Sequence, residues 1–169
     1  MSFETIEDMF QLAINVERLA KTLYLGLEDM FADHPEVAHF WHHYADEEEG
    51  HAAWLEQTLA RLSPEQRETQ GDLVIVEKLR HISHTPIKSL LAGIANLEDA
   101  FQLVNDLENS ETNVVFEFLV ENFADDEDTR RFLKNQLRNH VGNLLIEFPT
   151  QFRSAAIRRS IQVRRLEEG

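Results

Sequence analysis

The chain has 169 residues, of which 43% are hydrophobic and 28% are charged, which is enough for one well-filled core and short for two. Its 31 acidic and 16 basic residues give a formal net charge of −15, which disfavours nucleic acid as a partner, because a polyanion is attracted to accumulated positive charge. There is no cysteine, so disulfides, thiolate zinc sites and iron–sulfur clusters are excluded, and any metal must bind nitrogen and oxygen ligands.

Targeting signals are not evident. The start MSFETIEDMF lacks the basic residues and the apolar stretch of a secretory signal, and no apolar run approaches the roughly 20 residues of a membrane span. We therefore expect a cytoplasmic protein with neither a membrane nor a nucleic acid as its partner.

The predicted elements are helices punctuated by proline, which fits the first turn of a helix but not its interior. Apolar residues recur every three or four positions, and no segment alternates as a strand does. The sequence predicts an all-α protein with helices at 5–31, 35–62, 86–122 and 126–147, of which the third could break near Asn109. A shorter basic helix follows at 151–166.

Helices of more than 20 residues joined by short turns pack most simply as an antiparallel bundle. The connector at 63–85 is long enough to cross that bundle. We expect one four-helix domain over residues 1–150, followed by a basic amphipathic helix or tail over 151–169. A weak internal repeat relates 13–28 to 94–108 and aligns Glu17 with Glu98. By the same pseudo-symmetry His51 corresponds to His140, if the second half holds about eight extra residues.

The segment after Gln151 opposes the body of the protein in charge, because it carries five arginines and two glutamates. We expect it to fold onto its own acidic body or onto a second subunit, most simply in a homodimer. Docking of an acidic partner is the other interpretation. The residues that would form this basic surface are Arg153, Arg158, Arg159, Arg164 and Arg165.

The second helix directs two polar residues toward its apolar side. Glu48 points with the bulky apolar residues, and His51 falls at the edge of the same arc, about 60° away. A buried carboxylate without a partner costs several kcal/mol, and an acid and an imidazole three positions apart can bind one cation. Asp46, Glu47 and Glu49 fall outside the arc and are interpreted as solvent-exposed.

Each of the other long helices also carries a polar residue at its apolar side: Glu17, Glu98 and His140. Any one of them alone is explained as a face-boundary acid or a hydrogen-bonded core histidine. One such set in each of four helices favours a shared site. Tyr24 and Tyr44 lie on the same stripes and are expected to be core tyrosines or hydrogen-bond partners of the site.

This pattern resembles the ferritin-like superfamily, and within it the rubrerythrin-type domain, whose bundle carries a Glu on two helices and a Glu-x-x-His pair on the other two. Glu17 in INVERLAKTLY and Glu98 in NLEDAF match the single glutamates. Glu48 and His51 in EEGH match the first pair, and His140 in LRNH matches the second histidine. The resemblance covers roughly residues 5–147. It implies a ferritin-like four-helix bundle with a metal site built from these five residues.

The resemblance also implies a cofactor and a chemistry. Iron, as one or two ions, is the first candidate, with manganese or zinc as alternatives. The implied reaction is oxidation of bound iron by dioxygen or peroxide, a ferroxidase- or peroxidase-type activity. Rubrerythrins typically add a rubredoxin-like iron centre held by four cysteines, which this chain lacks, so a redox-active protein would need an external electron donor. The alternative function is that of a metal-free helical bundle that acts through its acidic surface or basic tail.

One departure from the family pattern is Leu137, which stands three positions before His140, where a glutamate is expected. The site is therefore predicted to be less negative and weaker at one position. Glu147, two turns after His140, could compensate only if the helix geometry changed.

Two other histidine patterns resemble metal sites. His43 and Glu47 spell the His-x-x-x-Glu of hemerythrin-like bundles, but His43 points about 140° away from Glu48. His81 and His84 in the connector are interpreted as loop or helix-end residues rather than as a surface metal site.

Overall fold

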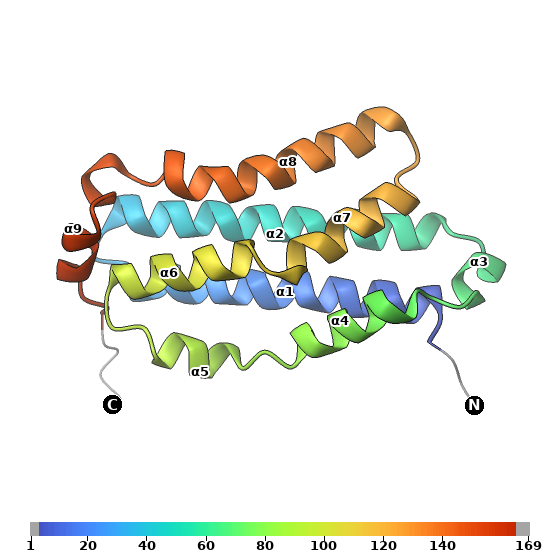
Figure 1. Ribbon diagram of the computed structural model, residues 1–169, viewed down its shortest axis with the longest axis horizontal. Coiled ribbons are helices and arrows are strands. Elements are labelled where there is room, and N and C mark those ends of the chain that lie inside the picture. Colours follow the sequence, from blue (N-terminus) through green and yellow to red (C-terminus); the bar gives the residue numbers. More distant parts are fainter. Residues whose placement is uncertain (1–3, 165–169) are drawn as a thin grey trace.

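Two long antiparallel helices form the base of the fold. The computed structural model describes residues 4–164, apart from the side chains of residues 111, 141 and 143. Helices α1 (Ile6–Met30) and α2 (Pro35–Arg61) pack along most of their length (Figure 1). A capping box starts α1, in which Thr5 and Asp8 satisfy each other's backbone amides. The predicted all-α fold is confirmed, since no β-strand occurs among residues 4–164.

The connector to the second half of the bundle is partly helical. It contains α3 (Pro64–Glu68), α4 (Leu73–Ser83) and α5 (Ile87–Ala92). Figure 1 shows α4 and α5 running along α1, and both pack against it. The connector predicted at 63–85 was expected to cross the bundle, and in the structure the crossing segment also includes α5, which the sequence assigned to the third helix.

The third member of the bundle is divided into α6 (Leu97–Glu108) and α7 (Glu111–Phe123). The chain breaks after Glu108, where the Ser110 hydroxyl caps the next helix by accepting the Thr112 amide at 3.3 Å. This break near Asn109 was expected. A second break, at residues 93–96, was not expected. There the Asn96 side chain accepts the Asp99 amide at 2.9 Å and caps the start of α6.

Helix α8 (Glu127–Ile146) completes the bundle and packs on α6 and α7. None of the helices in the described part of the chain is long and apolar enough to cross a membrane.

The apolar interior is divided into two halves along the bundle axis. One core lies toward the α3 end and includes Phe10, Leu55 and Phe116. The other lies toward the α9 end and includes Trp41 and Phe148. In every bundle member the sequence passes from one core to the other through a buried polar residue. These residues are Glu17, Glu48, His51, Glu108 and His140.

The C-terminal segment closes one end of the bundle. It consists of the 3₁₀ turn η1 (Thr150–Phe152) and α9 (Ala155–Ser160), which is shorter than the predicted helix at 151–166. The Leu97 amide donates to the Ile161 carbonyl at 2.9 Å, and the Val163 amide donates to the Ala95 carbonyl at 3.1 Å. The segment therefore folds onto its own body at the start of α6. Arg165, part of the expected basic surface, lies outside the described residues.

One arginine anchors this segment. Arg158 is buried, donates from Nε to the Glu98 carboxylate, and places its guanidinium carbon 4.0 Å from the ring centroid of Phe101. The hydrogen bond from Arg158 lowers the pKa of Glu98 below its usual value. An arginine of the basic C-terminal segment is thus paired with a glutamate of the acidic body of the same chain.

Arg158→Ala is expected to lower the free energy of unfolding by about 2 kcal/mol, because a charged hydrogen bond and a ring contact are lost while Glu98 stays partly covered. The change is measured by the midpoint of denaturant unfolding. Arg159→Ala is the matched control, since Arg159 is exposed and its Nε donates to the Ala155 carbonyl of its own helix. The control should change stability by less than about 0.5 kcal/mol. Equal effects of the two variants would contradict the anchoring role.

Candidate metal centre

Five buried acidic and histidine side chains meet midway along the bundle. Helix α1 contributes Glu17, α2 contributes Glu48 and His51, the last turn of α6 contributes Glu108, and α8 contributes His140. They form two groups, Glu17–Glu48–His51 and Glu48–Glu108–His140, and within each group the ligand-type atoms lie within 4.8 Å of one another. Glu48 belongs to both groups and joins them into one centre.

The first group is loosely bonded. Nδ1 of His51 lies 3.5 Å from Oε2 of Glu17 and 3.6 Å from Oε2 of Glu48, distances that are long for hydrogen bonds. Among the described residues, Oε2 of Glu17 and Nε2 of His51 have no hydrogen-bond partner. The His51 ring stacks on Phe116, with 4.4 Å between the ring centroids. Buried polar atoms without partners are costly, so this group is incomplete as it stands.

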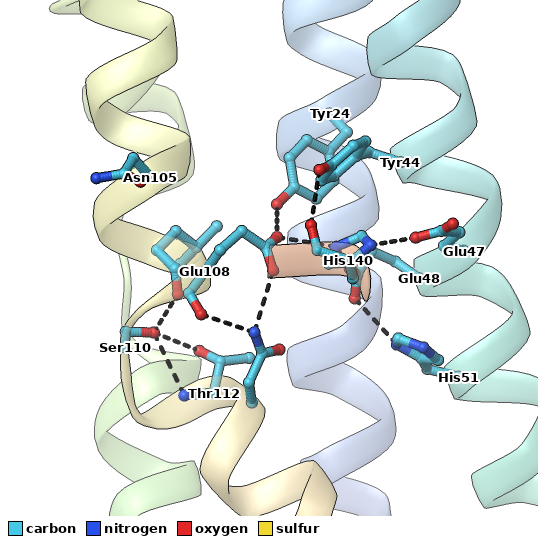
Figure 2. A network of polar contacts seen from close by, with 12 residues as sticks. Tyr24, Tyr44, Glu47, Glu48, His51, Asn105, Glu108, Ser110, Thr112 and His140 are labelled. Carbon is cyan, nitrogen blue, oxygen red and sulfur yellow. Dashed lines mark hydrogen bonds and ion pairs between the residues drawn. The ribbon is translucent and has the colours of Figure 1, made fainter. Parts of the chain in front are cut away.

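The second group is more closely bonded (Figure 2). Nε2 of His140 lies 3.0 Å from Oε1 of Glu48 and 3.0 Å from Oε1 of Glu108. The helix break after Glu108 lets Asn113 turn back, and its amide donates to Oε2 of Glu108 at 3.1 Å. Glu108 is therefore held by the local structure of the α6–α7 junction.

Two tyrosines cover the α9 side of the centre. The Tyr24 hydroxyl donates to Oε1 of Glu108, and the Tyr44 hydroxyl donates to the His140 carbonyl at 2.8 Å. Figure 2 shows both phenols directed at the second group. Burial and the charge of Glu108 raise the pKa of Tyr24, so its hydroxyl stays protonated and remains a donor. Both residues are buried in the core and bonded to the site, as the two sequence interpretations allowed.

Glu47 takes part in the centre, contrary to its interpretation as a solvent-exposed residue. Its side chain is only 15% exposed, and its Oε2 bonds to Nδ1 of His140. Burial opposes its charge, but the bond to His140 outweighs that effect and lowers its pKa. A carboxylate on one imidazole nitrogen fixes the ring and leaves the other nitrogen for a ligand. The Cβ of Glu47 points away from the core, but the glutamate side chain is long enough to turn back and reach His140.

The three core carboxylates cannot all be charged without compensation. Burial and the neighbouring charge of Glu48 raise the pKa of Glu17 well above its usual range. Burial also opposes the charge of Glu48, but the neighbouring side chains of Glu17, His140 and His51 outweigh that effect and hold the Glu48 pKa below its usual range. In the absence of a cation, the centre therefore favours the protonated form of Glu17 beside the charged Glu48.

Protons also occupy the two imidazoles. Burial opposes the charged form of His51, but the carboxylates of Glu17 and Glu48 outweigh it and raise its pKa to about 10. The carboxylates around His140 overcome burial in the same way and raise its pKa well above the usual value. The protons on the centre thus supply the positive charge that a metal would otherwise supply.

Glu98 is a correction to the predicted site. Its carboxylate pairs with Arg158 at the start of α6, about 15 Å along the helix from Glu108 at 1.5 Å per residue. One continuous helix over 86–122 would carry the apolar stripe of Ile87 and Leu91 on to Glu98, but these two residues belong to the separate helix α5. Within α6 the buried stripe is Leu97, Phe101, Val104 and Glu108.

The sequence held a signal for Glu108. The first half places its single glutamate 34 positions before the histidine, from Glu17 to His51. Glu98 lies 42 positions before His140, which required the extra residues, whereas Glu108 lies 32 positions before it. The similar spacing in the two halves favours Glu108.

The remaining candidate positions supply no ligand to the centre. Leu137 is buried in the apolar core about one turn before His140 on α8. Glu147 is exposed and does not replace the missing carboxylate. His81 and His84 belong to neither of the two ligand groups found among the described residues.

The residues of the centre fit a metal ion. Ligand atoms about 2.1 Å from one shared ion lie roughly 3 to 4 Å apart, which matches the spacing of Glu17, Glu48 and His51. Oε2 of Glu17, which has no hydrogen-bond partner among the described residues, is available as a metal ligand. Carboxylates with imidazoles suit iron, manganese or zinc.

A four-helix bundle whose middle carries carboxylates and histidines from each of its members defines a protein of the ferritin-like class. The Rubrerythrin family model matches residues 8–134, well over half of the chain, and the chain belongs to that family. The match ends before His140, which the fold nevertheless brings to the centre. Comparison with curated proteins and with solved structures gives no match.

Proposed function

We propose that this protein binds iron through Glu17, Glu48, His51, Glu108 and His140 and promotes oxidation of ferrous iron by dioxygen or peroxide. The observation that carries the proposal is the pair of buried ligand groups that share Glu48. Membership of the rubrerythrin family, which typically binds iron, favours this metal over manganese or zinc.

The two groups are expected to bind with unequal strength. The three carboxylates of the two ligand groups, Glu17, Glu48 and Glu108, supply at most three negative charges, whereas two ferrous ions carry four positive charges. The group that contains His140 lacks the carboxylate that Leu137 replaces, and its atoms already bond to one another. We infer a tighter ion at Glu17, Glu48 and His51, and a weaker second ion at Glu48, Glu108 and His140.

The surrounding residues have separate tasks in this proposal. Bound ferrous iron supplies the electrons for reduction of the oxidant. Tyr24 orients Glu108, Glu47 orients His140, and the two apolar cores exclude water from both ends of the centre. No cysteine-held electron carrier exists in these 169 residues, so repeated turnover requires an external donor.

Glu108 and Glu98 provide a matched pair of variants, because both lie on α6. Glu108→Ala should abolish the second, weaker step of a Co²⁺ titration followed by calorimetry, since it removes a ligand. Glu98→Ala should retain both steps and reduce only stability, since it removes the partner of Arg158. The reverse pattern would restore the Glu98 assignment and contradict the site described above.

Metal affinity should rise with pH. The pKa of His51, raised to about 10, means that its imidazole is protonated near neutral pH without metal, and the raised pKa values of Glu17 and His140 favour their protonated forms too. A metal must displace those protons. Each displaced proton weakens binding by about tenfold per unit fall in pH. Zn²⁺ affinity measured by competition with a chelator should therefore be at least about tenfold lower at pH 6 than at pH 7. Equal affinity at both would contradict metal binding by these groups.

The reaction is tested by mixing anaerobically loaded protein with dioxygen or with peroxide and following the absorbance of ferric iron. Oxidation should be faster than that of the same Fe²⁺ concentration with Glu48→Gln protein. Equal rates would leave iron binding intact but remove the proposed activity.

A further inference from the structure

A surface cavity of about 480 Å³ opens beside the first half of α2 and the segment that follows α8. It is lined by Glu36, His39, Phe40, His43, Glu147 and Pro149. His39 and His43 are four positions apart and so project from the same face of α2. Two imidazoles and two carboxylates therefore surround one opening.

Glu47 links this cavity to the buried centre. Its Oε1 lies 3.2 Å from Nε2 of His43, and its Oε2 bonds to Nδ1 of His140. The His43 side chain is 55% exposed, that of Glu47 is 15% exposed, and that of His140 is fully buried. Side chains of types that can bind a metal thus follow one another from solvent to the core.

The side chains that border the centre at Glu108 are less suited to pass a cation than the route through His43 and Glu47. Tyr24 and Asn113 present a hydroxyl and an amide, both neutral. The cavity, by contrast, places Glu36 and Glu147 at its wall and Glu47 behind it. Carboxylates around an opening raise the local concentration of cations and the rate at which they bind.

We propose that this cavity is an outer binding site for a divalent cation, which His39 and His43 capture and which Glu47 passes to His140 and the buried centre. The destination of the ion rests on the function proposed above, whereas capture at the surface does not. The paired histidines and acids match the ligand preferences of ferrous iron and of its substitutes Co²⁺ and Mn²⁺.

Loading kinetics test the transfer. Co²⁺ uptake by metal-free protein is followed by stopped-flow absorbance for the parent and for the double variant His39→Gln/His43→Gln. The double variant should load about tenfold more slowly and reach the same final amount. His42→Gln is the matched control, because His42 is similarly exposed on α2 but pairs with Glu28 and Asp46. An unchanged rate in the double variant, or an equal loss in His42→Gln, would overturn the proposal.

Capture at the surface is tested separately. Full-length Glu48→Gln protein, whose buried centre is expected to retain no ion, is freed of metal and titrated with substoichiometric Mn²⁺ while the imidazole NMR signals are recorded. Signals of His39 and His43 should broaden first, with those of His42, His81 and His84 still sharp. Simultaneous broadening of all five would overturn the outer site. If the buried centre takes up no metal, the loading experiment gives no signal in the parent either, while this titration still reports on the cavity.

Discussion

Leu137→Glu is expected to lower the unfolding free energy of the metal-free protein by about 3 kcal/mol, because it buries a carboxylate in an apolar core. With Fe²⁺ present, the sign should reverse. The new carboxylate lies one turn before His140 and supplies the ligand that the weaker group lacks. The variant should therefore retain about two iron ions per chain after desalting, against about one in the parent, and should oxidise Fe²⁺ faster.

Leu133→Glu separates this effect from a general response to iron. Leu133 is also buried on α8, but it lies seven positions before His140 rather than three. Its glutamate should destabilise the protein to a similar degree, without rescue by metal. If Leu137→Glu stays as unstable as Leu133→Glu when Fe²⁺ is added, Leu137 does not face the centre and the weaker group is wrongly assigned.

Glu48→Gln should weaken iron binding more than any other single change, because Glu48 is the residue shared by the two groups. Loss of its charge removes a ligand from both ions and the counter-charge of both His51 and His140. We expect the affinity for the first ion to fall by more than about 100-fold, since even indirect partners of a metal site account for 10- to 100-fold. The affinity is measured by Co²⁺ titration.

Glu49→Gln is the control for this variant. Glu49 is the next residue on α2, but its carboxylate pairs with Lys21 at 3.1 Å on the partly exposed surface. Its binding steps should equal those of the parent. A Glu48→Gln protein that keeps the parental affinity for the first ion would show that the shared carboxylate is not a ligand.

The sequence predicted those parts of the site that depend on one uninterrupted helix. Glu48 and His51 lie on α2, where a fixed period of 3.6 residues relates each side chain to the apolar stripe. Glu17 is placed by the same argument on α1. The helices run from 6 to 30 and from 35 to 61, close to the predicted bounds.

The error at Glu98 came from a feature that periodicity does not register. A capped turn of four residues at 93–96 resets the helical phase, so the stripe of α5 does not continue into α6. Glu47 was misplaced for a different reason. Helical projection gives the direction of Cβ, whereas a glutamate side chain has three further rotatable bonds and here reaches His140. Such contacts depend on the position of α8, which the local sequence does not determine.

The central claim is that the buried centre holds iron. The most direct test is to incubate metal-free protein with excess Fe²⁺ under anaerobic conditions, desalt it, and measure iron per chain by elemental analysis, with Glu48→Gln treated in parallel. We expect about one iron per chain in the parent and none in the variant. A folded parent that emerges without iron, like the variant, would contradict the claim and identify a helical bundle whose histidines alone neutralise its buried carboxylates.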